Sequence, residues 1–117
     1  MGVGKFVGST TFIAGGCDWN INVYPDGNKT EDEGDYVSVF LCLRKIGAAA
    51  GAVRVKFILF LLEKDGRVSR LQGRPASLAH TFESEGGDWG LNKFIKKSML
   101  QKFLRRNNDS LIVRCDL

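Results

Sequence analysis

The sequence has little of the chemistry that enzymes and metal sites use most often. His80 is the only histidine among 117 residues, which excludes two-histidine metal sites and histidine relays. The three cysteines, Cys17, Cys42 and Cys115, form no CxxC pair, which argues against a zinc ribbon and a disulfide framework. No glycine-rich loop opens a helix after a strand, so a phosphate cradle lacks support. We expect no enzyme activity, no cofactor and no metal.

Long hydrophobic runs are also missing. The longest, Phe57–Leu62, has six residues, whereas a helix needs roughly 20 to cross a bilayer. The first ten residues contain no apolar block of the length that a signal peptide needs. Each cysteine lies in an apolar run, where a reduced, buried thiol is the common outcome. We therefore expect no membrane contact and a location in the cytoplasm or the nucleus.

What is present is typical of one globular domain with a real core, since 44% of the residues are hydrophobic and 26% charged. Apolar and polar residues alternate in short segments, which indicates antiparallel strands. We expect strands at residues 10–13, 17–24, 36–43, 53–62, 68–71, 80–82 and 111–117. Turn signals at 24–27 and 64–66 separate them, and 28–35 and 47–52 read as loops. About seven short strands predict an all-β sandwich, with one or two short helices late in the chain.

One of these strands has two apolar faces. Val37, Val39, Leu41 and Leu43 predict a core face, but the opposite face carries Phe40 among Tyr36, Ser38 and Cys42. Either a second layer covers this face, or Phe40 lines a groove. The residues themselves leave both readings open.

The stretch from His80 to Lys97 is the most distinctive part of the chain. Trp89 stands between Asp88 and Gly90 after a glycine-containing loop, so its ring should lie at a surface. Surface aromatics of this kind bind partners because a large ring loses few rotamers on binding. The alternative is a loop tryptophan that folds back onto the end of the core. The spacing of Leu91, Phe94 and Ile95 favours a short helical segment, and 98–106 favours a second helix.

The basic stretch from Lys93 to Arg106 offers a competing function. Its six cations, with Phe94 and Phe103 interleaved, fit a nucleic-acid backbone. The alternative is a solvated helix face whose aromatics belong to the core. The modest net charge of +4 and the acidic run at Glu31–Asp35 favour that alternative over nucleic-acid binding.

Several motifs in order resemble the MATH (meprin and TRAF homology) domain family across nearly the whole chain. They are VGSTTF, CDWNINVYPDG, DYVSVFL, AVRVKFILFLLEKDG, HTFES, DWGLNKFIKKSML and SLIVRCDL. The likeness is to MATH–BTB adaptors, which plants carry in many copies and of which the speckle-type POZ adaptor is a relative. The resemblance implies a TRAF-like antiparallel sandwich of about eight strands that binds short extended peptides without catalysis.

The resemblance also implies a site, a shallow aromatic groove. The peptide-binding residues it implies are Phe40, Phe57, His80, Asp88, Trp89, Gly90, Leu91 and Lys93. Alternation alone puts Phe57 on the core face, so a groove role for Phe57 requires a bulge. Leu91 and His80 stand where relatives carry aromatic rings, and Asn92 replaces a lysine, which should change the peptide that fits.

In MATH–BTB adaptors a BTB domain dimerises and docks on a cullin, so that the bound substrate is ubiquitinated. The resemblance leads us to expect a MATH domain over residues 1–117, without the family's first strand, which would precede Gly4, and without a BTB domain. We expect a substrate-recognition module whose partners are unstructured peptide segments, with the cullin reached only through a BTB domain. The alternative is a shortened module that associates with other chains through an open sheet edge.

Overall fold

A computed structural model describes residues 5–27, 36–47, 52–72, 75, 77–106 and 112–116. Its strands are β1 (Val7–Gly8), β2 (Phe12–Ala14), β3 (Cys17–Tyr24), β4 (Tyr36–Lys45), β5 (Val53–Leu62), β6 (Ser77–Phe82), β7 (Asp88–Lys96) and β8 (Ile112–Asp116). The helices are a short 3-10 turn, η2 (Arg70–Gln72), and α1 (Lys97–Arg106). The expected loop 28–35, most of the loop 47–52 and the helix-ending residues 107–109 lie outside the described residues.

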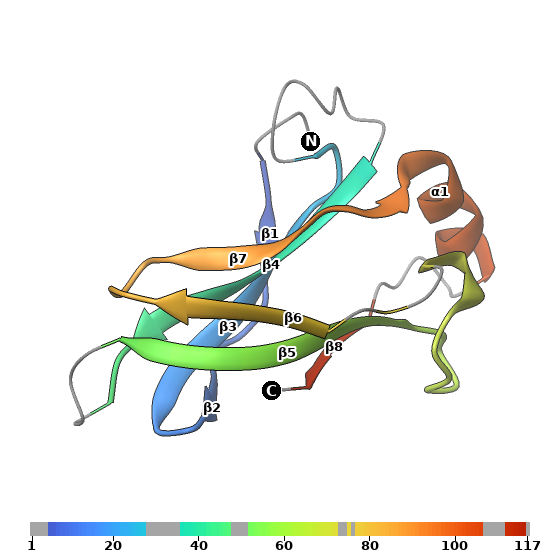
Figure 1. The fold of residues 1–117 in the computed structure, drawn as a ribbon. Helices are drawn as coiled ribbons and strands as arrows, with labels where there is room; N and C mark the ends of the chain where they lie inside the picture. The colour runs from blue at the N-terminus through green and yellow to red at the C-terminus, as the bar shows by residue number, and fades with distance from the viewer. Residues whose placement is uncertain are drawn as a thin grey trace.

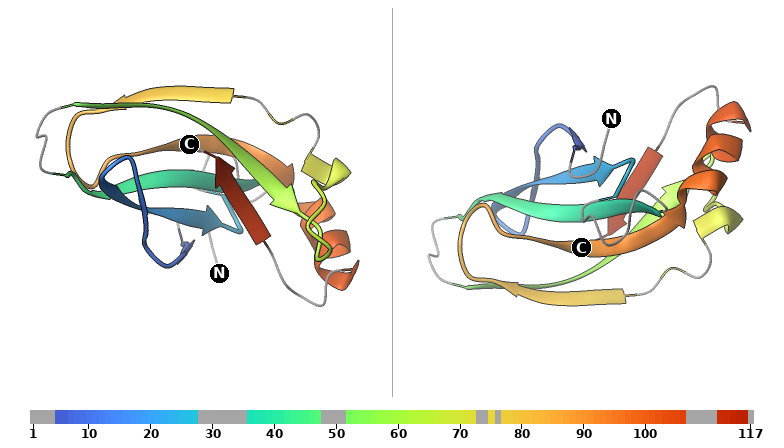
Figure 2. Two further views of the ribbon diagram at one scale, coloured as in Figure 1. Left: turned by 90° about the horizontal axis from the view of Figure 1, so that it is seen from below. Right: turned by 90° about the horizontal axis from the view of Figure 1, so that it is seen from above.

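The strands form two antiparallel sheets that pack as a sandwich, which confirms the predicted fold class (Figure 1). The first sheet has the order β1-β3-β4-β7, with β2 also paired to β3, and the second has the order β6-β5-β8. Seen from below and above, the two sheets lie as separate layers with α1 at one end (Figure 2). The edge strands β6 and β7 lie side by side on one flank of the sandwich (Figure 1).

Alternating side chains fill the space between the sheets. Trp19 on β3, Leu41 on β4 and Leu59 on β5 are each at most 1% exposed. These residues belong to one continuous cluster of buried apolar side chains. Because burying a large apolar side chain contributes about 1.5–3 kcal/mol, this cluster is the main source of stability. The predicted core face of β4 is therefore confirmed.

The two predicted turns are also present. The amide of Gly27 donates to the carbonyl of Tyr24 over 3.1 Å, and Gly27 has a φ of 86°. In the second turn the amide of Gly66 donates to the carbonyl of Glu63, and Gly66 has a φ of 89°. Glycine suits both positions because a side chain at positive φ costs energy.

The helical segment expected around Leu91 to Ile95 is wrong: these residues belong to strand β7. The register of β7 against β4 shifts between Val37 and Val39, so that Leu91 lies opposite Val39 and Ile95 opposite Val37. The four residue steps from Leu91 to Ile95 on β7 therefore span the same length as the two residue steps from Val39 to Val37 on β4. In a regular strand two neighbouring side chains face opposite sides, but beside this bulge Phe94 and Ile95 are both buried. Leu91, Phe94 and Ile95 therefore have the spacing that one face of a helix produces.

The helix predicted at 98–106 is confirmed as α1. Leu100 and Phe103 are buried against the core, and Lys97 at the start of the helix pairs with Asp26. Phe94 on the preceding strand is also buried, so neither phenylalanine of the basic stretch is free to stack on a base. This burial favours the solvated-face alternative over nucleic-acid binding. In the parts of the chain that the structure describes, no helix has the length and apolar character to span a membrane.

Candidate functional site

Trp89 lies near the start of β7, an edge strand of the first sheet. Its register partner is Leu41, whose side chain faces the core. Paired residues on antiparallel strands share a face, so Trp89 points toward the space between the sheets. At the open flank of the sandwich this leaves the ring 45% exposed. The expectation that Trp89 lies at a surface is thus confirmed, although it belongs to a strand and not to a loop.

The second sheet supplies the surface on which Trp89 rests. His80 on β6 stacks flat on the indole, with ring centroids 4.2 Å apart and planes within 4° of parallel. His80 also meets Phe82 edge-on at 4.8 Å, and Phe82 meets the buried Trp19 edge-on at 5.3 Å. Four rings therefore run in sequence from the core to the surface. Because each ring touches the next, the position of the exposed indole is set by the core.

This stack gives a first prediction. Replacing His80 with alanine should leave Trp89 unsupported on one face, so that acrylamide quenches its fluorescence more strongly than in the wild type. Trp19, at 1% exposure, should contribute little to the change. The matched control is Thr81→Ala, an exposed neighbour on the same strand. Equal quenching in His80→Ala and the wild type would mean that the stack does not hold the indole in solution.

Phe40 lies on the other face of the first sheet. It forms a small apolar cluster with Tyr24 and Cys42, separate from the main core. Tyr24 packs edge-on against Phe40 at 5.6 Å, and Phe6 packs on Tyr24 at 5.2 Å. Of the two readings of this face, the covered one holds, since Phe40 is only 7% exposed. Among the described residues, no ring contact joins Phe40 to Trp89.

Asp88 and Gly90 share this outer face. Asp88 lies opposite Cys42 and Gly90 opposite Phe40. Gly90 allows the two backbones to approach closely, because a Cβ there would overlap the Val39 carbonyl and lie 2.7 Å from the Phe40 Cα. Burial, with a further contribution from the Asp88 carboxylate, raises the pKa of the Cys42 thiol to about 11.

The raised pKa of Cys42 predicts a loss of stability at alkaline pH. The unfolded thiol, with a pKa near 9.0, loses its proton before the folded one does. The protonated Cys42 thiol therefore makes its full contribution to the free energy of unfolding below pH 9, and this contribution decreases as the pH rises toward 11. Burial also raises the pKa of Tyr24, which acts in the same direction at higher pH. Urea unfolding of Cys42→Ala between pH 9 and 11 should show a smaller decrease than the wild type, and equal decreases would contradict the assignment.

Two of the implied groove residues lie in the core or against it. Phe57 is 1% exposed and belongs to the central core cluster, so the groove role implied for its side chain is wrong. No bulge interrupts the pairing of β5 with β6, and alternation therefore holds. Leu91 is half-buried and packs against the same core.

Lys93 remains at the surface of β7. Its ammonium lies 5.3 Å from the centre of the Tyr36 ring, which is a cation–π distance. Tyr36 was not among the implied site residues, and neither was Tyr24. Tyr36 lies on the outer face of β4, for which a covering layer was one of the two readings, and Tyr24 packs on Phe40 of that face from β3.

The implied site residues thus divide between the two sides of β7. His80 and Trp89 face the flank where the sheets meet, whereas Phe40, Asp88 and Gly90 lie on the outer face of the first sheet. Between them runs the outer edge of β7, which pairs only with β4 among the described strands. Such an edge presents main-chain N–H and C=O groups to another extended segment.

Comparison with known proteins gives the same family throughout. The family model described as MATH domain matches residues 1–117. BTB/POZ and MATH domain-containing protein 5 of Arabidopsis thaliana is 35% identical over 98% of this chain, and protein 3 of the same plant is 32% identical over 98%. The chain spans 28% and 29% of the length of these two relatives.

The match over the full length of the chain agrees with the observed antiparallel sandwich, and a protein-interaction role is what this relationship supports. The chain belongs to the MATH domain family.

Proposed function

We propose that this chain binds short, extended peptide segments of other proteins along the outer edge of β7. The observation that carries this proposal is the half-exposed Trp89, which His80 holds flat at that edge. A large ring already fixed in place loses little entropy when a ligand packs on it. The exposed tryptophan therefore fits a binding residue better than a residue of the fold.

An added strand would use both sides of β7. Successive side chains of an extended peptide point to opposite faces, so alternate residues would reach either the Trp89–His80 pair or the side that carries Asp88 and Gly90. The edge of β7 would supply main-chain hydrogen bonds, the mode known as β-augmentation. Lys93 and Lys96, both exposed, add positive charge further along the strand.

Within a larger protein, we infer that this recognition serves a MATH–BTB-type adaptor of a cullin ubiquitin ligase. The names of the similar plant proteins join a MATH domain to a BTB/POZ domain. In such an arrangement the β7 edge selects the substrate, and a BTB domain would make the contact with the cullin. His80 and Leu91 depart from the residues that the family carries at these positions, so the peptide specificity should be this chain's own.

The test is a synthetic peptide array followed by affinity measurements on the strongest sequence. Trp89→Ala should weaken its binding by about 1–3 kcal/mol, or roughly fivefold to 150-fold. The fold should survive because the ring is 45% exposed. Phe6→Ala is the matched control, since Phe6 is an exposed aromatic on the β1 side of the same sheet.

Phe40→Ala is less suitable as a test of contact. With Phe40 at 7% exposure, its removal would also leave a cavity and lower the stability. A Trp89→Ala variant that folds normally and binds the peptide as tightly as the wild type would contradict the proposed function. Equal losses in Trp89→Ala and Phe6→Ala would also contradict it.

A further inference from the structure

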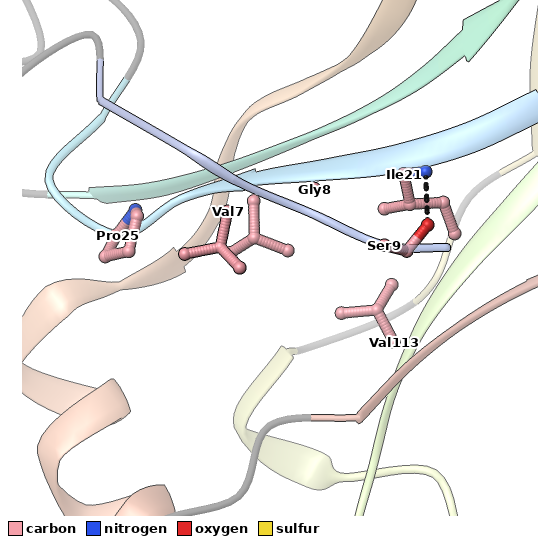
Figure 3. Close-up of a pocket in the computed structure, with 7 residues that line it drawn as sticks. Val7, Gly8, Ser9, Ile21, Pro25 and Val113 are labelled. Atoms are coloured by element: carbon pink, nitrogen blue, oxygen red, sulfur yellow. Dashed lines mark hydrogen bonds between the residues drawn. The ribbon is translucent and has the colours of Figure 1, made fainter. Parts of the chain in front are cut away.

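The opposite flank of the sandwich has an open apolar cavity of about 440 Å³. Val7 on β1, Ile21 and Val23 on β3, Pro25 and Val113 on β8 line it, so both sheets contribute (Figure 3). None of the described residues that line it is charged. The hydroxyl of Ser9 at its rim already accepts a hydrogen bond from the Ile21 amide over 2.8 Å and donates one to the Thr10 carbonyl. The cavity therefore offers apolar contact almost exclusively.

The chain beside this cavity exposes unusually large apolar side chains. Phe6, Val7 and Ile13 are 50%, 56% and 78% exposed. They make up three of the five large hydrophobic residues that are exposed in the described part of the chain. Val7 shares the inner face of the sheet with Val23 and lines the cavity, whereas Phe6 packs on Tyr24 on the outer face, so this edge is apolar on both faces. Strand β1, which carries Val7, pairs on one side with β3 and has no other strand partner among the described residues.

Charge distinguishes this edge from the edge at β7. Between residues 5 and 16, Lys5 is the only charged residue, so two such segments can approach without strong repulsion. On β7, by contrast, Lys93 and Lys96 are exposed, and lysines on an edge strand oppose pairing with a like strand. The edge at β1 thus combines a strand with one described partner, an apolar cavity and an exposed valine, Val7, at the cavity.

We propose that this flank binds a second copy of the chain, with β1 of each copy pairing antiparallel to β1 of the other. A two-fold axis between the strands makes the surface self-complementary, as closed dimers require. Each copy brings Val7 to the cavity of the other on the inner face, Phe6 lies on the outer face of the same edge, and the two four-strand paths join into one sheet. The proposal leaves the β7 edges, at the far side of each sheet, open for peptides.

The test is sedimentation velocity of the full chain over a wide range of concentrations. The wild type should convert from monomer to dimer as the concentration rises. Val7→Asp should raise the dissociation constant by about tenfold or more, because a carboxylate would be buried in an apolar interface. Phe6→Asp provides a second variant at the same edge. The control is Val68→Asp, which adds the same charge at a valine 39% exposed elsewhere on the surface.

Circular dichroism should show that each variant is folded, as expected for exposed positions. A wild type that remains monomeric at every concentration would overturn the proposal. A dimer that Val7→Asp and Phe6→Asp leave intact, or that Val68→Asp weakens equally, would overturn it as well. Peptide binding through Trp89 should be unchanged in Val7→Asp, so the failure of this proposal is distinguishable from the failure of the proposed function.

Discussion

Replacing Phe57 with alanine should lower the free energy of unfolding by about 3–5 kcal/mol, the usual cost of removing a buried phenylalanine. Phe57 is 1% exposed and lies in the same core cluster as Leu59 and Phe82. Its removal would take away packing on both sheets, and β-sandwich interiors collapse only partly around such a gap. Urea unfolding followed by circular dichroism measures this change directly.

The matched control is Phe6→Ala, since the ring of Phe6 is 50% exposed and its loss should cost much less. The two outcomes separate a core residue from a groove residue. If Phe57→Ala left the stability nearly unchanged but abolished peptide binding, the ring would belong to the site after all. We expect the opposite result: Phe57→Ala loses much of its stability, and any loss of peptide binding follows from unfolding.

Gly90→Ala is expected to destabilise the domain by about 3 kcal/mol, the upper end of the cost of overpacking, roughly 1–3 kcal/mol. The added Cβ would overlap the carbonyl of Val39 and lie 2.7 Å from the Cα of Phe40. Both are backbone atoms, so relief requires β4 and β7 to move apart. The measurement is the midpoint and slope of urea unfolding, together with amide exchange in β7.

Gly8→Ala serves as the control on the opposite edge of the same sheet. A Cβ at Gly8 would lie 3.1 Å from Asn22 Oδ1 and 3.2 Å from Asn20 Nδ2. Those are ends of side chains, which can adjust more readily than backbone. Equal losses in the two variants would indicate a general cost of losing glycine from an edge strand, and would contradict a specific close approach at Gly90.

The alternation of apolar residues was enough to predict most of the fold. In Cys17–Tyr24 and Tyr36–Leu43 every second side chain is apolar, and both segments are strands with that face in the core. The pattern failed at Leu91–Ile95, where β7 bulges against β4 and the neighbours Phe94 and Ile95 are both buried, which gives Leu91, Phe94 and Ile95 the spacing of a helix. A bulge depends on the partner strand, so a single segment read by itself cannot reveal it.

The site was less accessible to prediction for the same reason. The exposure of Trp89 followed from its small neighbours, but its stack on His80 joins two strands from different sheets. Residue spacing carries no information about which rings meet across a sandwich. Phe57 shows the opposite case: alternation indicated the core, the family likeness implied the groove, and the local physical pattern was correct.

The two flanks of the sandwich have contrasting character. At the β6–β7 flank a chain of rings leads from Trp19 to the half-exposed Trp89, and exposed lysines follow along the strand. At the β1–β8 flank the described residues that line the cavity are uncharged and mostly aliphatic. Because edge charges discourage self-pairing, the first flank suits a foreign peptide and the second suits a copy of the chain. If both proposals hold, opposite flanks of one small sandwich bind two different partners.

The central claim, that an extended peptide lies along β7, is tested most directly by amide hydrogen exchange with and without the strongest array peptide. The claim predicts slower exchange for amides within Asp88–Lys96 and a shifted resonance for the Trp89 indole N–H. Exchange in β1 and α1 should stay as it was. Protection confined to β1, β8 or α1, with β7 and the Trp89 indole unchanged, would contradict it.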